Sequence, residues 1–152
     1  MLKKGTQAPE FDLEDQDGKR HTLKSLLAKG PLILYFYPAD FTPGCTKEAC
    51  SFRDGYGAYK KAGVEILGVS PDSPASHAKF KEKYSLPFTL LADEGHKVCD
   101  IYGVWGPKKF AGKSYEGVLR TTFLINPEGK IIKVFENVKP DGHSDEILAA
   151  IK

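Results

Sequence analysis

Apolar residues along the chain fall into short blocks that Gly, Pro and charged residues separate. Blocks of aliphatic, β-branched and aromatic residues between such breaks indicate buried strands. We expect strands at residues 32–37, 64–69, 118–125 and 130–135, and a short strand within 86–91. Apolar residues spaced by three and four positions predict amphipathic helices. We expect helices at residues 43–62, 74–84 and 141–151, with shorter helical segments at 24–28 and 96–102.

The order of these segments predicts the fold class. Residues 11–23 carry the turn signal Asp17-Gly18 between two short, partly alternating segments, which indicates an N-terminal β-hairpin. The strand, helix and strand over residues 32–69 predict a βαβ unit with parallel strands and a right-handed crossover. Residues 103–115 are rich in Gly and Lys, which predicts a loop. We therefore expect an α/β fold in which a central mixed sheet has helices on both faces.

Length and composition narrow the class of protein. With 152 residues the chain is long enough to bury its own core, and we expect one domain over residues 1–152. Its 22 basic and 20 acidic residues form no basic stripe, which argues against nucleic-acid binding. The first residues contain no apolar run of signal-peptide or transmembrane length, so we expect a cytoplasmic protein. The sequence shows no long exposed apolar stripe, so a monomer is expected.

The candidate chemistry lies where the strand at 32–37 meets the helix that follows it. Thr42 is a good N-cap and Pro43 suits the first helical position, which puts Cys45 in the first turn. Unpaired N–H groups and the positive end of the helix dipole favour a thiolate there. In parallel sheets, ligands bind beyond the carboxyl ends of the strands. Cys45 is therefore a candidate activated nucleophile, and a buried structural cysteine is the alternative.

Several motifs in the same order along the chain point to one family. Residues 38–45 match the pattern P-x-x-x-T-x-x-C, and a second cysteine, Cys50, follows Cys45 by five positions. Residues 5–13, residues 98–105 and an arginine, Arg120, within 118–125 complete the set. In these motifs the chain resembles the peroxiredoxins, and in particular their bacterioferritin-comigratory (PrxQ) branch. The resemblance covers nearly the whole chain and implies a thioredoxin-like fold.

This resemblance also implies a role for each motif residue. Cys45 would be the peroxidatic thiolate that attacks a small hydroperoxide, and Cys50 would be the resolving thiol that closes an intramolecular disulfide. Arg120 would stabilise the thiolate, Thr42 would hydrogen-bond the substrate oxygen, and Pro38 would shape the loop. Thioredoxin would reduce the disulfide. The cysteines carry the electrons, so the resemblance implies no metal, haem or flavin.

Each of these residues also has a simpler interpretation. Arg120 can lie on the solvent side of its strand, and capping alone would explain Thr42. Glu48 can orient Arg120 or lie exposed on its helix. Cys99 is most simply a core cysteine, with a second resolving thiol as the alternative. A zinc site built from Cys45, Cys50, His96 and Cys99 would need closely convergent ligands and is disfavoured.

Three other functions compete with a peroxidase. A disulfide oxidoreductase of the thioredoxin type relies on C-x-x-C, and this chain lacks that motif. A cysteine phosphatase with C-x5-R is disfavoured because Ser51 stands where the arginine would be. The non-enzymatic alternative is a redox-sensing or metal-binding module that only reports oxidation. Peroxide consumption beyond one equivalent separates an enzyme from such a sensor.

Overall fold

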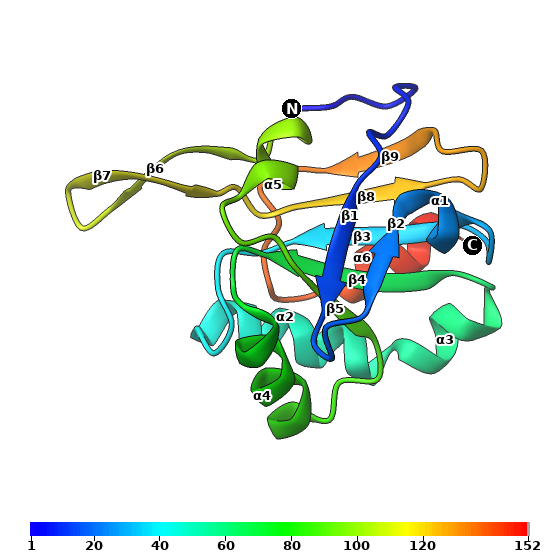
Figure 1. The fold of residues 1–152 in the computed structure, drawn as a ribbon, viewed down its shortest axis with the longest axis horizontal. Helices are drawn as coiled ribbons and strands as arrows, with labels where there is room; N and C mark the ends of the chain where they lie inside the picture. Colours follow the sequence, from blue (N-terminus) through cyan, green and yellow to red (C-terminus); the bar gives the residue numbers. More distant parts are fainter. Residues whose placement is uncertain (152) are drawn as a thin grey trace.

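The computed structural model describes residues 1–151, apart from the side chain of Phe110. A seven-stranded sheet in the order β2-β1-β5-β4-β3-β8-β9 forms its centre, and a two-stranded sheet, β6-β7, projects from it (Figure 1). The strands are β1 (Asp12–Asp15), β2 (Arg20–Thr22), β3 (Leu32–Phe36), β4 (Glu65–Ser70), β5 (Thr89–Ala92), β6 (Trp105–Phe110), β7 (Lys113–Val118), β8 (Thr121–Ile125) and β9 (Ile131–Phe135). The helices are α1 (Leu23–Leu27), α2 (Pro43–Asp54), α3 (Tyr56–Lys61), α4 (Pro74–Tyr84), α5 (Lys97–Ile101) and α6 (His143–Ile151).

The middle of the sheet determines where the site lies. β3 pairs in parallel with β4 and antiparallel with β8, and all five of its residues are buried. An unbroken apolar strand of this kind is expected where both faces of a sheet are covered. In the β3–β8 register, Phe36 lies opposite Thr121. The residues just after β3 and just before β8 therefore meet at one edge of the sheet.

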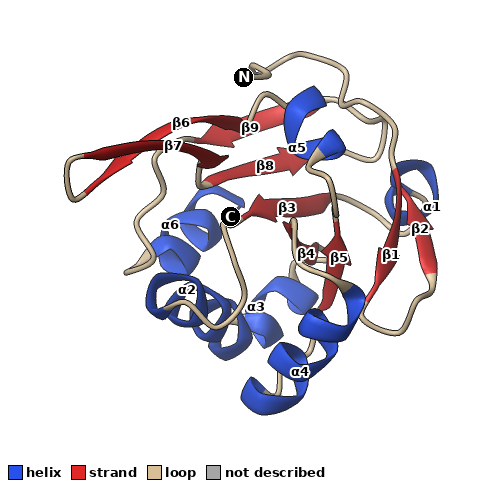
Figure 2. Cartoon of the chain, turned by 60° about the vertical axis from the view of Figure 1, so that its left-hand side comes forward, coloured by secondary structure: helices blue, strands red, loops and turns tan. Residues whose placement is uncertain are grey.

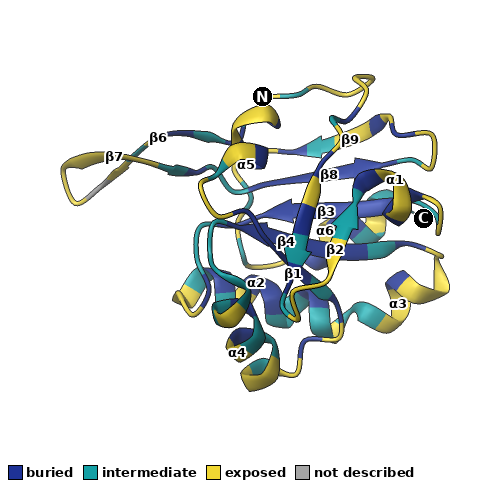
Figure 3. Ribbon diagram, in the orientation of Figure 1, coloured by how far each residue is buried: buried dark blue, intermediate teal, exposed yellow. Residues whose placement is uncertain are grey.

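Helices cover both faces of the sheet, as the sequence predicts (Figure 2). α2, α3, α4 and α6 pack on one face over a core that includes Tyr35, Phe52 and Phe80. α1 and α5 cover the other face, over a core that includes Phe36 and Phe123. The central strands are buried along most of their length, whereas much of the outer helix surface is exposed (Figure 3). The mixed α/β fold and its N-terminal hairpin, β1–β2, are confirmed.

Two expected elements are interrupted. The single helix expected at 43–62 is wrong, because Gly55 separates α2 from α3. A Cβ atom at Gly55 would lie 2.9 Å from Ser144 Oγ, so α6 packs directly against this break. The single strand expected at 118–125 is also wrong, because β7 ends at Val118 and β8 begins at Thr121. The chain changes from the small sheet to the central sheet between them, and Arg120 lies in that connection.

The loop expected at 103–115 is wrong as well, because most of it belongs to the β6–β7 hairpin. The two strands pair from Trp105↔Val118 to Phe110↔Lys113. Ala111 and Gly112 turn the chain with positive φ angles of 52° and 79°, as a tight hairpin turn requires. Most of the hairpin is exposed, so no alternation of buried and exposed residues marked it in the sequence. Among residues 1–151, no helix has the length and apolar character needed to cross a membrane.

Candidate active site

Cys45 lies in the first turn of α2, just beyond the carboxyl end of β3, and is 1% exposed. Thr42 is the N-cap residue with extended backbone, and its carbonyl accepts a hydrogen bond from Thr46 N at 2.9 Å. The Thr42 side chain makes no capping bond, because its Oγ1 donates to Ala39 O at 2.9 Å instead. The Cys45 thiol therefore lies near the positive end of the helix dipole, in the turn whose N–H groups lack partners within the helix.

Arg120 and Glu48 complete a buried triad with Cys45. Arg120 Nη2 donates to Cys45 Sγ at 3.3 Å, and Nη1 donates to Glu48 Oε1 at 2.7 Å. The Glu48 side chain is 1% exposed and that of Arg120 17%, so the solvent-facing alternatives for both residues are wrong. Burial raises the pKa of Glu48 to about 7, although the Arg120 charge lowers it. Burial opposes the charge of Arg120, but Glu48 and then Cys45 raise its pKa overall.

Two further polar groups lie near this triad, and the sequence analysis did not single them out. Lys108 of β6 donates from Nζ to Val118 O at 2.8 Å. Burial, and then the Arg120 charge, lower the pKa of Lys108, whereas the Cys45 charge raises it. Tyr35 is buried, and burial followed by the Glu48 charge raises the pKa of its phenol. A hairpin that was expected to be a loop supplies Lys108, so no local signal marked it.

The other two cysteines lie in different surroundings. Cys50 is half-buried on α2 and lines a groove of about 450 Å³ between α2 and the start of α6. Cys99, on α5, is 0% exposed and belongs to the core on the opposite face of the sheet from Cys45. Burial, and then Asp93, raise the pKa of the Cys99 thiol well above its ordinary value. The disfavoured zinc ligand set therefore does not converge.

The loop between β3 and α2 holds the remaining expected site residue. Pro38 is half-buried and begins this loop. Asp40, two residues further on, is buried and accepts hydrogen bonds from Tyr37 Oη, Ser76 Oγ and the ring of His77. No local pattern in the sequence marks this cluster, because its members are up to 40 positions apart.

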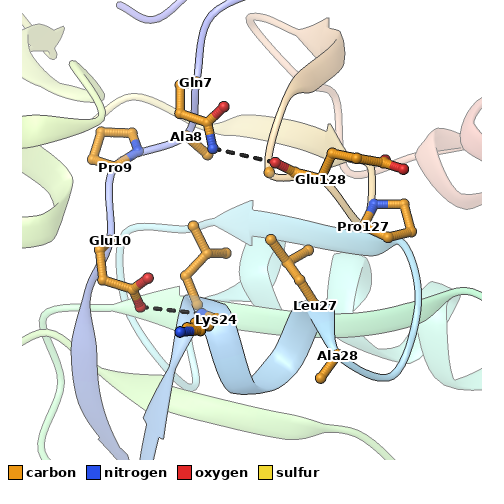
Figure 4. Close-up of a pocket in the computed structure, with 11 residues that line it drawn as sticks. Gln7, Ala8, Pro9, Glu10, Lys24, Leu27, Ala28, Pro127 and Glu128 are labelled. Atoms are coloured by element: carbon orange, nitrogen blue, oxygen red, sulfur yellow. Dashed lines mark hydrogen bonds between the residues drawn. The ribbon is translucent and has the colours of Figure 1, made fainter.

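A groove of about 670 Å³ (Figure 4) lies away from this site. It is formed by the segment before β1, by α1 and by the β8–β9 turn, beside the start of β3 rather than its end. Gln7 Nε2 donates to Glu128 O across it, and Glu10 accepts from Lys24 N. Cys45 does not line this groove.

A central strand that ends at a buried thiol, with an arginine aimed at its sulfur, is the arrangement of a thioredoxin-fold peroxiredoxin. Comparison with known proteins agrees with this class. Residues 4–134 match the model of the AhpC/TSA family. The chain is 48% identical to peroxiredoxin Bcp of Escherichia coli (strain K12) over 151 residues, which cover 99% of this chain and 96% of that protein.

Solved structures give the same result. Peroxidoxin BcpB from Mycobacterium tuberculosis superimposes with a TM-score of 0.89 at 38% identity, covering 99% of this chain and 97% of that one. The bacterioferritin comigratory protein of Xanthomonas campestris, a structure concerned with alkyl peroxide reduction, gives a TM-score of 0.86 at 39% identity over 93% of this chain and 89% of that one. The chain belongs to the AhpC/TSA family, in the Bcp and PrxQ branch of the peroxiredoxins.

Proposed function

We propose that this thiol peroxidase reduces hydrogen peroxide and small organic hydroperoxides with Cys45 as its peroxidatic cysteine. The observation that carries the proposal is the 3.3 Å contact between Arg120 Nη2 and Cys45 Sγ in the first turn of α2. The Cys45 thiolate attacks one peroxide oxygen, an S–O bond forms and the O–O bond breaks. The departing oxygen takes the O–O electron pair and a proton, and leaves as water or an alcohol. Cys45 becomes a sulfenic acid.

The other site residues act on the substrate or on Arg120. Arg120 faces the sulfur and stabilises the negative charge that moves from sulfur to the leaving oxygen. Glu48 orients the guanidinium through its 2.7 Å bond. The Thr42 hydroxyl holds the peroxide oxygen, and Pro38 shapes the loop and keeps water from the thiolate. Organic hydroperoxides enter the proposal through the alkyl peroxide reduction of the Xanthomonas relative.

Cys50 then resolves the sulfenic acid. Its sulfur attacks the Cys45 sulfur, an S–S bond forms, and water leaves. In the structure both cysteines lie on the regular helix α2. Five residues along an α-helix separate the Cα atoms by roughly 8–9 Å and turn the side chains to different sides. A disulfide needs Cα atoms closer than about 7 Å. We therefore propose that residues 42–52 unfold locally in each catalytic cycle.

The chain offers a natural boundary for this opening. Gly44 lies near the start of the segment and Gly55 just beyond its end, and glycine weakens a helix by roughly 1 kcal/mol relative to alanine. The structure already breaks the helix at Gly55. Beyond that break, Tyr59 Oη donates to Ser144 O at 2.9 Å and ties α3 to α6. α3 can therefore stay folded while α2 opens and exposes the new disulfide.

A dithiol protein, thioredoxin, then exchanges the disulfide back to two thiols. The cycle needs reduced cysteines at rest, which a cytoplasmic location provides. The described part of the chain exposes few large apolar side chains, which supports a monomer. They are Met1, Phe41, Ile101, Tyr115 and Ile132. Light scattering of the reduced protein tests the oligomeric state, and comparing thioredoxin with glutaredoxin as electron donor tests the reductant.

The decisive experiment follows peroxide consumption with a dithiol reductant in excess. An enzyme consumes many equivalents, whereas a redox sensor stops after one. Peptide mass mapping of the oxidised protein is expected to give a Cys45–Cys50 disulfide. Amide hydrogen exchange in residues 42–52 should be slow in the reduced protein and fast in the oxidised one. Equal protection in the two states, with that disulfide present, would disprove local unfolding. A Cys45–Cys99 bond would transfer the resolving role to Cys99.

A further inference from the structure

A fully buried carboxylate–imidazole pair lies beneath the loop that leads to Cys45. Asp40 comes from this loop, and His77 from α4. His77 Nδ1 is 2.7 Å from Asp40 Oδ2, and the two side chains are 0% and 1% exposed. None of the roles proposed above for the catalytic cycle uses either residue.

Both ring nitrogens of His77 face atoms that accept hydrogen bonds. Nδ1 faces the Asp40 carboxylate, and Nε2 is 3.0 Å from Leu91 O in β5. A carbonyl oxygen has no proton to give, so Nε2 donates to it. Nδ1 faces a carboxylate that also accepts from Tyr37 Oη at 2.6 Å and from Ser76 Oγ at 2.8 Å, and Tyr37 Oη lies 3.4 Å from Nδ1 itself. These contacts fit an imidazolium and a carboxylate joined inside the protein.

The same cluster is not a metal site. Asp40, Asp72 and His77 each offer one ligand atom within 4.8 Å of the others. These atoms are already engaged, because Asp72 Oδ2 accepts from Asp40 N at 2.8 Å and from Ser70 Oγ at 2.6 Å. A cation would have to displace bonds that fix the backbone of the loop. The geometry favours a structural link between the loop and its surroundings.

The loop needs such a link, because its backbone is strained. Phe41 has a φ of 64°, a left-handed conformation that costs energy in a bulky residue. Phe41 is 44% exposed, and its ring rests on Phe80 of α4 with 5.1 Å between ring centroids. Asp40 on one side of Phe41 is bonded to α4, and Thr42 on the other side donates its hydroxyl to Ala39 O at 2.9 Å. The Asp40–His77 pair therefore stands one strained residue away from Thr42.

We propose that Asp40 and His77 are positioning residues of the peroxide reaction. The chain of bonds from Leu91 O through His77 to Asp40 holds the loop so that the Thr42 hydroxyl meets the peroxide oxygen while Cys45 attacks. This inference rests on the proposed function. The inference predicts different effects on two reactions of the Cys45 thiolate. Peroxide must be aligned by the loop. An alkylating reagent such as iodoacetamide needs only the thiolate, which Arg120 and the start of α2 stabilise.

The test compares these two reactions in Asp40→Asn and His77→Gln. Misplacement by about 1 Å can cost on the order of a hundredfold, so we expect at least about a tenfold loss in the peroxide rate constant. The rate of Cys45 alkylation by iodoacetamide should stay within about twofold. The matched control is the exposed pair His96–Asp100, with a 2.9 Å contact. His96→Gln and Asp100→Asn should leave both reactions unchanged.

Parallel losses in both reactions, or no loss in either, would overturn the inference. Because Asp40→Asn and His77→Gln break a buried pair, Tyr37→Phe provides a milder variant, which removes the bond to Asp40 Oδ1 and the 3.4 Å contact with His77 Nδ1 but keeps the pair itself. It should lower the peroxide rate less, in the same selective way. An NMR spectrum of the reduced protein should show two N–H protons on the His77 ring, and a single one would contradict the ion pair. Failure of the proposed function would appear earlier, as absent peroxide turnover in the wild-type protein.

Discussion

Cys45 and Cys99 are equally buried, at 1% and 0% exposure, yet their neighbours carry opposite charges. Cys45 faces the Arg120 guanidinium at the start of a twelve-residue helix. Cys99 lies in the five-residue helix α5, and its backbone N–H donates to the Asp93 carboxylate at 2.8 Å. Burial disfavours a thiolate at both positions. The sign of the adjacent charge, rather than burial, therefore separates a candidate nucleophile from a core thiol.

Substituting the two cysteines in the same way should give the largest difference. Cys45→Ser is expected to abolish peroxide turnover without unfolding the protein, because it removes the nucleophile. Cys99→Ser should retain turnover within about twofold and lose stability, since a hydroxyl enters an apolar core at a cost of about 1–3 kcal/mol. Peroxide consumption and urea unfolding measure the two effects. Near wild-type turnover in Cys45→Ser would show that the nucleophile is misassigned.

Removing the positive charge beside Cys45 should have the next largest effect. Arg120→Met is expected to slow the peroxide reaction by about 10²-fold, as the loss of one donor to a developing oxyanion does in other enzymes. The pH dependence of Cys45 alkylation should move to higher pH at the same time. Arg20→Met is the control, because Arg20 is exposed and pairs only with surface carboxylates and a backbone carbonyl. An unchanged rate and an unchanged pH profile would remove Arg120 from the mechanism.

Glu48 connects this charge arrangement to the stability of the fold. Burial raises its pKa from 4.5 to about 7, so the folded state holds a proton that the unfolded state has lost between these values. Its contribution to stability is complete below about pH 4.5 and is lost as the pH rises through about 7. Glu48→Gln removes this titration. As the pH rises through this range, the free energy of unfolding of the variant should increase by on the order of 3 kcal/mol relative to that of wild type.

Urea unfolding at pH 4.5 and pH 8 measures that difference. Glu82→Gln on α4 is the control, because Glu82 is exposed and should follow the wild-type pH dependence. If Glu48→Gln follows the wild type as well, Glu48 stays ionised in the folded protein throughout this range. The Arg120 charge would then outweigh burial at this carboxylate.

The sequence predicted the strand and helix that position Cys45 better than it predicted the residues that surround Cys45. The strand at 32–37 and the helix start at Thr42 and Pro43 are local signals, and the structure has both within a residue. The bond between Arg120 and Glu48 joins residues 72 positions apart, so it depends on the β3–β8 register. The family resemblance suggested that Arg120 points at Cys45, whereas local pattern favoured an exposed arginine and left the partner of Glu48 open.

Other features could not be predicted for different physical reasons. The β6–β7 hairpin, which supplies Lys108, is mostly exposed, so the alternation that reveals a half-buried strand is absent. The break at Gly55 follows from the close approach of Ser144, which is a tertiary contact. The Asp40–His77 pair needs the loop, α4 and β5 to be in place together. Local pattern therefore located the candidate nucleophile, and tertiary packing determined the groups that surround it.

The smallest expected effect on activity comes from the charge beside Cys99. Asp93 is 1% exposed and accepts hydrogen bonds from Val98 N and Cys99 N, at 3.1 and 2.8 Å. In Asp93→Asn, the amide presents an N–H₂ group where one of these N–H donors needs an acceptor. One buried donor is then left unpaired, which costs about 1–3 kcal/mol. The negative charge also disappears, but burial alone still raises the pKa of Cys99.

Asp93→Asn should therefore lower the free energy of unfolding while peroxide turnover stays within about twofold of wild type. Arg120→Met should show the opposite pattern, in which peroxide turnover falls strongly and the free energy of unfolding changes less. Urea unfolding and turnover are measured on both variants at a temperature where each is fully folded. A tenfold loss of turnover in Asp93→Asn would contradict the comparison, because the surroundings of Cys99 would then contribute to catalysis. If Asp93→Asn loses stability but keeps its peroxide turnover, the Asp93 carboxylate stabilises α5 and has no role in catalysis.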